Sequence, residues 1–561
     1  MSKIKPIARW ARVQNEVLDG VQQIGLVAYH KDGIKEIRYK INVGGKGPAD
    51  LSTVLSNFGK ITTEGDMNGD GIVDATDLSI VLAQFNSEYE VIVSETTPNQ
   101  KTKIEEYSFD FDFSSLEDGE TVTISARVIA NDGSELVFDE PYSMNPKEGY
   151  ENLASYAEPL LVSRLGIHNL VLEKTYVAKT YRVELDGSDT NDGINAPFKT
   201  GEKAFSVAIS GDTIQFGDGE FVLIRPKTTP STQGKSKWLT VRGTDKTLFV
   251  TKDNKESFGS PKQAIRWINV TLDMGRCGYF YGKDMWWDNC KFINPSNEPW
   301  YEDGLAKKGK PDPSIPLSIN GKEDNVFRQI GGEQSFTDCF LSNYCSAFSG
   351  ALLVRNCNIR RIWGDAFSQG NGVFNVNIDT FAGFLTDKHS DIYQGWAVRE
   401  NVIMVGVYAT NVTSVQGIFI RPVLAGSDWY PPNRPVFNPE VDKPCYFGNG
   451  AFVNNTFIHT PEPKPEKGIE NAGGPPFTQF SNKFFHVLLI NHKSPYQKIL
   501  FGGNTSNDGW EPNIKEDVIL INCDLHWDNI FVMETKWNKI EDGYELNGVK
   551  ALGCYNTVQK S

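Results

Sequence analysis

Asn356-Cys357-Asn358-Ile359 is one copy of a four-residue phrase that decides the fold expected for most of this chain. The phrase consists of an Asn or Asp, a small residue, any residue and a large apolar residue. Its copies begin at Asn269, Asn289, Asp338, Asn356, Asn375, Asn401, Asn455 and Asn522, with successive spacings of 20, 49, 18, 19, 26, 54 and 67 residues. The short spacings are those of single solenoid turns, and the long ones predict extra turns with projecting loops. Because each turn buries its apolar positions against its neighbours, we predict one coiled domain over residues 181–535.

All eight cysteines lie after residue 276, and four of them occupy the second position of the phrase. These four are Cys290, Cys339, Cys357 and Cys523. A repeated context predicts a repeated structural slot, which suits a small and easily buried thiol. Disulfides are a weaker alternative because a chain of 561 residues does not need them. Zinc is weaker still because no pair of CxxC elements occurs, so we predict free thiols in the core of the coil.

The coil is predicted to open with a strand and a Gly/Asp-rich turn between Tyr181 and Gly193. Ala196-Pro197-Phe198, a short helical stretch at 204–208 and a strand at 211–216 follow in that order. This order resembles the opening segment of right-handed parallel β-helices of the pectate-lyase-like superfamily. The resemblance implies a scaffold that also occurs in bacterial and viral surface proteins, and it implies no particular reaction.

The first 150 residues alternate apolar and polar side chains with a period of two. The clearest alternating stretches are 37–41, 107–113 and 122–128. With Asn/Asp/Gly turns between them, they predict a half-buried antiparallel sheet, interpreted as an immunoglobulin-like sandwich over residues 1–150. Residues 151–180 are interpreted as a linker and 536–561 as a C-terminal strand or cap. The predicted fold class is therefore mainly β, an immunoglobulin-like sandwich followed by a right-handed parallel β-helix.

Residues 46–88 interrupt the strand pattern with a loop rich in oxygen ligands. Positions 1, 3, 5, 7, 9 and 12 of this loop are Asp66, Asn68, Asp70, Ile72, Asp74 and Asp77. Calcium takes six to eight hard oxygen ligands, and Gly71 at position 6 allows the sharp turn that gathers them. Ile72 would contribute its carbonyl, and Asp74 would act through a water. We predict a Ca²⁺ site; the alternative is an acidic turn without metal.

Two helical segments flank this loop and are near copies of each other. They are Asp50-Leu-Ser-Thr-Val-Leu and Asp77-Leu-Ser-Ile-Val-Leu, which lie 27 residues apart. Loop and helices together resemble dockerin modules and related EF-hand-like calcium repeats, which implies a bound calcium ion. The segment before Asp50 contains no second Asp-x-Asn-x-Asp-Gly loop, so half of the duplicated calcium pair is missing.

A polar constellation on the coil is the candidate for catalysis. Asp365, Asp391 and Gln416 share one phase, with spacings of 26 and 25 residues. On consecutive turns their backbones would lie about 4.8 Å apart. His389 and Gln394 fall on the same turn as Asp391, and Arg421 lies just beyond. Paired carboxylates at this separation suit a retaining glycosidase, and wider pairs suit inversion. An arginine near acidic residues would instead suit calcium-assisted lyase chemistry, as in pectate-lyase-like relatives.

Two other interpretations of this constellation are open: a ligand or metal site without catalysis, and a structural polar ladder paired along the coil. Asp365, Asp391 and His389 are the candidate catalytic residues, and Gln394, Gln416 and Arg421 the candidate ligand contacts. Trp429 and Tyr430 lie in a projecting loop at 427–444. They would offer a stacking platform for sugar rings or would anchor the loop against the coil.

Charge and hydropathy exclude several classes of function. The net charge is −15, which repels phosphate backbones and makes nucleic acid an unsuitable partner. No apolar run approaches the roughly 18 residues of a membrane span, so no membrane insertion is expected. The first ten residues also lack the apolar stretch of a secretory signal.

An architecture of extracellular type without an export signal is consistent with a virion protein. We therefore expect a viral, bacteriophage-type appendage, such as a tail spike, a tail fibre or a capsid-surface projection, made in the host cytoplasm. Its N-terminal domain would bind other virion proteins, and its coil would face host-surface polysaccharide. The resemblance to β-helix spikes implies a homo-oligomer, with a trimer favoured. The alternatives are a secreted polysaccharide lyase or glycoside hydrolase and an extracellular, non-catalytic, calcium-dependent adhesion module.

Overall fold

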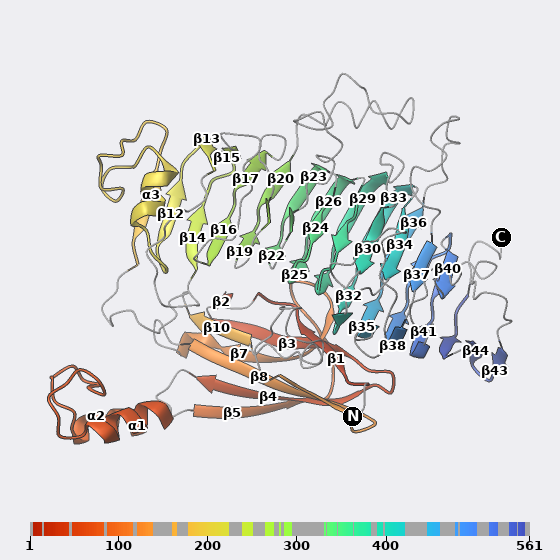
Figure 1. The fold of residues 1–561 in the computed structure, drawn as a ribbon, viewed down its shortest axis with the longest axis horizontal. Coiled ribbons are helices and arrows are strands. Elements are labelled where there is room, and N and C mark those ends of the chain that lie inside the picture. The colour runs from red at the N-terminus through yellow and green to blue at the C-terminus, as the bar shows by residue number, and fades with distance from the viewer. Residues whose placement is uncertain are drawn as a thin grey trace, which may run out of the picture.

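A computed structural model gives the fold in segments along the chain. It describes residues 4–13, 16–18, 20–43, 48–83, 87–115, 121–138, 160–164, 178–223, 238–250, 264–273, 280–281, 285–293, 330–331, 334–344, 346–362, 364–382, 390–395, 399–413, 415–420, 446–459, 477–480, 483–496, 498–501, 515–525, 538–546 and 548–555. Strands dominate these residues, and long parallel sheets account for most of them (Figure 1). The prediction of a mainly β chain with long parallel sheets is confirmed.

Three sheets form a coil in the second part of the chain, and successive strands pass from one sheet to the next. The long sheet has 16 strands: β11 (Thr180–Val183), β12 (Thr213–Phe216), β14 (Leu239–Arg242), β16 (Ile265–Ile268), β19 (Met285–Asp288), β22 (Gln334–Thr337), β25 (Leu353–Arg355), β28 (Gly372–Phe374), β31 (Arg399–Glu400), β32 (Ile403–Val405), β35 (Tyr446–Val453), β38 (Lys483–Ile490), β41 (Lys515–Ile521), β43 (Asn538–Ile540), β44 (Gly543–Leu546) and β45 (Val549–Leu552). Its pairings are parallel, including β41 with β45, except for β43 with β44 and β44 with β45, which are antiparallel.

The other two sheets complete each turn of the coil. The second sheet has 11 strands: β13 (Gly219–Val222), β15 (Thr247–Val250), β17 (Thr271–Asp273), β20 (Lys291–Ile293), β23 (Phe340–Tyr344), β26 (Asn358–Ile362), β29 (Asn377–Ala382), β33 (Tyr408–Thr413), β36 (Thr456–His459), β39 (Lys493–Ser494) and β42 (Asp524–Leu525). The third sheet has eight: β18 (Phe280–Tyr281), β21 (Ile330–Gly331), β24 (Phe348–Ser349), β27 (Phe367–Ser368), β30 (Asp391–Gly395), β34 (Gln416–Ile420), β37 (Phe477–Phe480) and β40 (Lys498–Phe501). Helix α3 (Gly201–Val207) lies near the start of the coil, where the Thr200 hydroxyl accepts the amide hydrogen of Lys203 at 3.2 Å and caps it.

One corner of the coil explains the repeated phrase. The Asn or Asp of the phrase turns the chain between the long and second sheets with a positive φ, for example 54° at Asn356 and 57° at Asp338. Asn is among the residues that best tolerate this left-handed conformation. The side chains stack from turn to turn, since Asn375 Nδ2 donates to Asn356 Oδ1 at 3.0 Å. The phrase therefore encodes a backbone turn.

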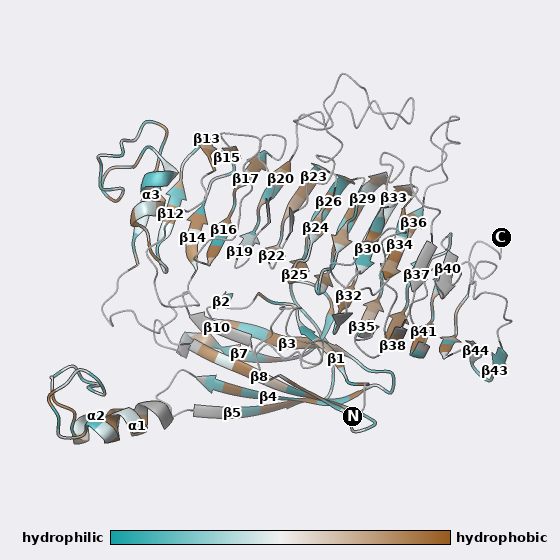
Figure 2. Cartoon of the chain, viewed as in Figure 1, coloured by the Kyte–Doolittle hydropathy of each residue, from teal (hydrophilic) through white to brown (hydrophobic). Residues whose placement is uncertain are grey.

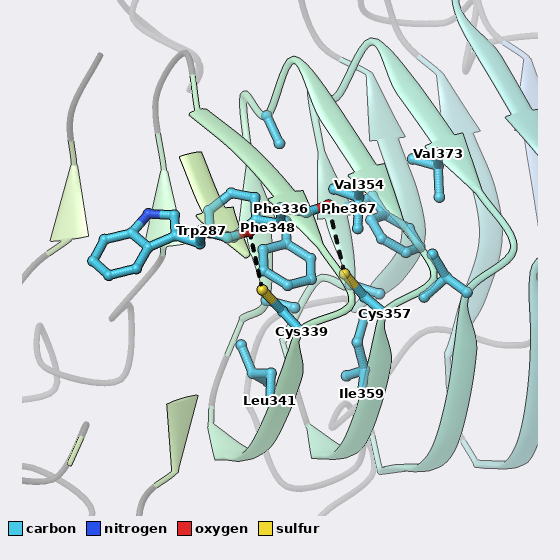
Figure 3. Packing of buried hydrophobic residues seen from close by; sticks show 14 of the residues in the cluster. Trp287, Phe336, Cys339, Leu341, Phe348, Val354, Cys357, Ile359, Phe367 and Val373 are labelled. Atoms are coloured by element: carbon cyan, nitrogen blue, oxygen red, sulfur yellow. Dashed lines mark hydrogen bonds between the residues drawn. The ribbon is translucent and has the colours of Figure 1, made fainter. Parts of the chain in front are cut away.

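The residue after this corner points into the core of the coil. Cys290, Cys339, Cys357 and Cys523 fill this slot, and all four are buried and free, as predicted. Each thiol donates to backbone carbonyls of the long sheet, as Cys339 does to Trp287 at 3.3 Å (Figure 3). The slot thus accepts a small side chain that can also make one weak hydrogen bond.

Two copies of the phrase were placed wrongly by the sequence pattern. On the turn assigned to Asn401 the corner is Gly406, with φ 69°. One turn later the corner is Asn454, and Asn455 occupies the core slot, where it donates to the carbonyl of Met404 at 3.1 Å. Glycine and adjacent asparagines all suit the left-handed corner, so the pattern alone does not fix the register there.

The N-terminal part is a sandwich of two sheets. The first sheet, which faces the coil, contains β1 (Ile7–Trp10), β3 (Val21–Tyr29), β7 (Glu105–Asp112) and β6 (Thr97–Pro98). The opposite sheet contains β2 (Glu16–Leu18), β10 (Leu160–Arg164), β8 (Thr121–Ala130), β4 (Ile34–Val43), β5 (Ser87–Val93) and β9 (Glu135–Phe138). A short 3-10 helix, η1 (Phe113–Ser115), follows β7. Strand β10 falls within the segment interpreted as a linker, and it pairs with both β8 and β2.

A helical hairpin projects from the sandwich on the side away from the coil (Figure 1). It consists of α1 (Pro48–Asn57), the acidic loop and α2 (Ala75–Ala83). Its core is small, with Val54, Val73 and Val81 fully buried. Outside the hairpin, the strands of the coil are largely hydrophobic, as expected for sheets that are covered on at least one face (Figure 2).

The sandwich docks on the outer face of the long sheet. Inward-facing residues of that sheet, such as Val354, belong to the core of the coil, whereas the neighbouring Leu353 faces the sandwich. The shared apolar cluster contains Ile7, Ala11, Val13, Val27 and Ile104 of the sandwich and Trp238, Trp286, Leu353, Phe374, Ile403, Val405, Ala451, Val453, Leu488 and Ile519 of the coil. The long sheet is thus buried on both faces where the sandwich lies.

Candidate functional site

The acidic loop between α1 and α2 is folded around its own carboxylates. Asp66 accepts two backbone amide hydrogens, from Gly69 at 2.7 Å and from Gly71 at 2.8 Å. Both glycines have a positive φ, 77° and 90°, which bends the backbone back over the Asp66 side chain. Asp70 accepts the amide hydrogen of Ile72 at 2.9 Å, so the middle of the loop turns in the same way.

Asp77 connects the two ends of the loop. Its carboxylate is buried and accepts amide hydrogens from Met67 at 2.6 Å, Asn68 at 3.2 Å and Asp74 at 2.7 Å. These backbone donors, with that of Asp74 the strongest, lower the pKa of Asp77 below its ordinary value. Asp77 is therefore charged at neutral pH and ties the start of the loop to the start of α2.

The donor set of this loop fits a hard divalent cation. Four carboxylates, one amide oxygen and the Ile72 carbonyl occur within the 12 residues from Asp66 to Asp77. A carboxylate has about four acceptor positions, so the backbone hydrogen bonds of Asp66 and Asp77 leave capacity for a metal ion. All of these ligands are oxygens, and Ca²⁺ prefers oxygen ligands in number. The residue types therefore suit the predicted calcium site, although in this structure no three of the four described carboxylates lie within 4.8 Å of one another.

The second half of the acidic loop also pairs with residues 59–61, which lie just before the loop in the chain. The amide of Gly59 donates to the carbonyl of Val73 at 2.7 Å, and the amide of Val73 donates to the carbonyl of Lys60 at 3.0 Å. Ile61 and Ile72 form an antiparallel bridge at this place. Residues 59–61 thus support the acidic loop through backbone hydrogen bonds.

The second candidate site lies on the third sheet, where the structure brings together four of the predicted residues. Asp391 and Gln416 are partners in register on β30 and β34. The Asp391 amide donates to Asp365 Oδ1 at 3.1 Å. Gln394 of the same strand donates to Asp391 Oδ2 at 2.6 Å. Because these residues occupy equivalent positions on successive turns, their polar groups lie next to one another.

This polar group lies below the protein surface. Asp391 is 0% exposed, Gln394 5% and Gln416 4%, while Asp365 is half-buried. A general acid or nucleophile must reach a glycosidic oxygen or an anomeric carbon, and a fully buried carboxylate does not present itself to a sugar. His389, Arg421, Trp429 and Tyr430 lie outside the described residues.

A set of polar contacts between sandwich and coil was not predicted from the sequence. Asn401 binds both main-chain groups of Ala8, and Arg355 donates to the carbonyl of Ala11 at 2.9 Å. Arg12 and Glu16 form a buried ion pair of 3.1 Å beside Arg355. Burial alone would raise the pKa of Glu16, but the guanidinium groups of Arg12 and Arg355 hold it below its ordinary value. In the sequence, a charged Arg355 directly after the apolar pair Leu353-Val354 is the feature that could have pointed to this contact.

Comparisons with other proteins do not assign this chain to a family. No protein-family model, no curated protein and no solved structure matches it. Among the residues that the structure describes, no helix is long and apolar enough to cross a membrane.

Proposed function

We propose that this chain is a non-catalytic surface protein of a virus particle, of the bacteriophage tail spike, tail fibre or capsid-projection type. In this proposal the coil is a right-handed parallel β-helix of the pectate-lyase-like type, and the sandwich is immunoglobulin-like. The observation that carries the proposal is the docking of the sandwich on the long sheet. Five buried apolar residues of the sandwich pack there against ten of the coil. A sheet covered in this way serves as a stiff support and leaves no substrate groove there.

The buried polar group on the third sheet supports a structural role for the coil. Asp391, the centre of the candidate catalytic set, is fully buried: its amide donates to Asp365 of the neighbouring turn, and its carboxylate accepts a hydrogen bond from Gln394 of its own strand. Polar ladders of this kind satisfy the backbone and fix the stacking of turns. The polysaccharide lyase and glycoside hydrolase alternatives require a carboxylate open to a sugar, and they are less well supported.

Calcium has a structural function in this proposal. Asp66, Asn68, Asp70 and Asp74, with the Ile72 carbonyl and Asp77, would hold the ion. When bound, the ion neutralises four carboxylates that otherwise repel each other. The chain itself contributes the amide donors of Gly69 and Gly71 and the buried Asp77, which position the ligands before the ion arrives.

One observation favours a second function, a calcium-dependent adhesion module. Leu55, Phe58 and Leu82 of the helical hairpin are 55%, 49% and 56% exposed. Grouped apolar side chains on the surface often mark contact sites for other proteins. The hairpin would then attach the chain to other virion proteins, with its shape maintained by calcium.

Particle association and glycan cleavage test the proposed function together. Purified particles should contain the chain at a fixed stoichiometry, as a homo-oligomer and preferably a trimer. Incubation with a panel of surface polysaccharides should release no new reducing ends or unsaturated products. Cleavage that is lost in a folded Asp391→Asn variant, while the exposed-surface control Asp379→Asn keeps it, would establish an enzyme and overturn the proposal. Absence from particles would overturn the virion assignment.

A further inference from the structure

Two histidines meet where the tip of the sandwich touches the coil. His30 follows β3, and His486 lies within β38 of the long sheet. Their ring centroids are 4.7 Å apart, and the residues are 6% and 0% exposed. Neighbouring strands place Asn449 and Asp517 in register with His486, and all three residues have a positive φ, from 47° to 52°. This bend in three stacked strands presents the His486 ring to the sandwich.

The hydrogen bonds of His486 define its protonation state. Its Nε2 accepts the amide hydrogen of Lys31 at 3.1 Å, so this nitrogen carries no proton. Its Nδ1 lies 2.9 Å from Asn449 Oδ1, an oxygen that also accepts the amide hydrogen of Lys5 at 3.1 Å. Because Asn449 Oδ1 is an acceptor, Nδ1 is the donor. His486 therefore connects the coil to the N-terminal part only as a neutral ring with its proton on Nδ1.

His30 is also held as a neutral ring. Its Nδ1 accepts the amide hydrogen of Asp32 at 3.2 Å, which leaves Nε2 to donate to the Ser134 hydroxyl at 3.3 Å. Carboxylates of Asp32 and Asp132 lie 3.9 Å from the two ring nitrogens. Lys31 is the nearby cation, with its ammonium 3.1 Å from Asp32 and 4.0 Å from Asp517.

The charged and hydrogen-bonding neighbours of His30 indicate whether this cluster binds a metal ion or responds to protons. His30, Asp32 and Asp132 are close enough to share one ion. However, the ammonium of Lys31 already neutralises Asp32, and His30 Nδ1 is engaged by a backbone amide. A metal would have to displace both contacts. The cluster is better suited to respond to protons.

We propose that the His30–His486 contact is an acid-sensitive latch that holds the sandwich on the coil at neutral pH and loosens it on acidification. A proton on His486 Nε2 removes the acceptor of the Lys31 amide, and it places a positive charge against the His30 ring and the Lys31 ammonium. Burial lowers the pKa of both rings, in His486 to about 3. Once the contact opens, the ring regains an ordinary pKa near 6.5 and takes up a proton.

The sign of the pH effect follows from this difference. A group whose pKa is depressed in the docked state contributes its full stabilisation above pH 6.5 and loses it as the pH falls towards 3. At pH 4.5 the released ring is about two pH units into its charged range, so the opening equilibrium shifts by up to about 100-fold relative to pH 7.5. Asp32, Asp132 and Asp517 favour a charged ring and reduce the shift, whereas Lys31 and the paired histidine disfavour a charged ring and enlarge the shift.

Amide hydrogen exchange of the full chain tests the latch. The peptide containing Lys31 is compared at pH 7.5 and pH 4.5 in the natural protein, in His486→Gln and in His492→Gln. Comparing proteins at one pH cancels the chemical pH dependence of exchange. Gln retains an acceptor for the Lys31 amide but does not titrate. His492 is a buried histidine of the coil core away from the sandwich, and it serves as the matched control.

At pH 4.5 we expect the Lys31 amide to exchange at least tenfold faster in the natural protein and in His492→Gln than in His486→Gln, with equal rates at pH 7.5. Equal rates at pH 4.5 in all three proteins would overturn the latch. If His486→Gln does not fold, the natural protein alone is sufficient. Acidification must then release the Lys31 amide while amides of β25 and β28 stay protected, and parallel loss at both places refutes the proposal.

Discussion

Replacing Asn401 with leucine should detach the first strand of the sandwich from the coil. Asn401 Oδ1 accepts the amide hydrogen of Ala8 at 2.8 Å, and Asn401 Nδ2 donates to the carbonyl of Ala8 at 2.7 Å. Asn401 is 4% exposed and Ala8 0%, so water does not replace these contacts while the interface is closed. Leucine has a similar volume but offers neither a donor nor an acceptor.

The expected magnitude follows from the two main-chain groups that lose their partners. Each buried and unsatisfied backbone group costs about 1–3 kcal/mol, so Asn401→Leu should lower the free energy of unfolding by about 2–6 kcal/mol. The upper end applies if β1 stays in place, and the lower end applies if β1 moves into water and gives up its apolar contacts. Urea unfolding gives the change in stability, and hydrogen exchange of the Ala8 amide reports the local release.

Asn411→Leu is the matched control for this experiment. Asn411 lies on β33 of the same coil, is exposed, and makes one side-chain hydrogen bond of 2.8 Å to Asp379. Its φ of 53° is close to the 56° of Asn401, so leucine adds about the same 1–2 kcal/mol of left-handed backbone strain at both positions, and Asn401→Leu should lose about 2–6 kcal/mol in addition. If Asn401→Leu and Asn411→Leu have the same urea midpoint and the same Ala8 exchange rate, the sandwich is not docked through Asn401, and the support for a covered long sheet fails.

Three further predictions concern calcium, thiols and a buried carboxyl. Chelator, or Asp66→Ala in calcium, should make residues 46–88 protease-sensitive and leave the coil intact, whereas Asp110→Ala should not; equal resistance with and without calcium argues against a metal site. A maleimide should leave Cys290, Cys339, Cys357 and Cys523 unmodified in the native protein and should reach the half-buried Cys554 first among the described cysteines; a native disulfide among the four contradicts this. Burial raises the pKa of Glu106 to about 7, so its stabilisation is present below pH 4.5 and lost as the pH rises through 7. Glu106→Gln should therefore lose less stability between pH 5 and pH 8 than the natural protein or the exposed control Glu105→Gln. If the urea midpoint changes by the same amount between the two pH values in all three proteins, the prediction is refuted.

The acidic loop shows how much of a candidate site can be local. All of its ligand candidates lie between Asp66 and Asp77, and the amides that orient them come from the same 12 residues. Such a site can be predicted because residue type and spacing specify both the donors and the turn. The polar group around Asp391 was predictable only in part. Its phase follows from the repeat, whereas its burial depends on the surrounding structure.

The sequence by itself determined the corners of the coil and the contents of its core. A left-handed turn selects Asn, Asp or Gly through local backbone sterics, and the following slot takes a small side chain at most turns, although His492 fills it after Asn491. Where several residue types suit the same corner, as at Gly406 and Asn454, the local signal is degenerate and the register was wrong.

Only the tertiary structure decided how the sandwich lies on the coil. Ala8 meets Asn401 across 393 residues, and Lys31 meets His486 across 455. Each partner alone is an ordinary residue in an ordinary strand or turn, and its role arises when a distant surface removes it from water. Burial and hydrogen-bond partnership are properties of the pair, so no local pattern in either segment records them.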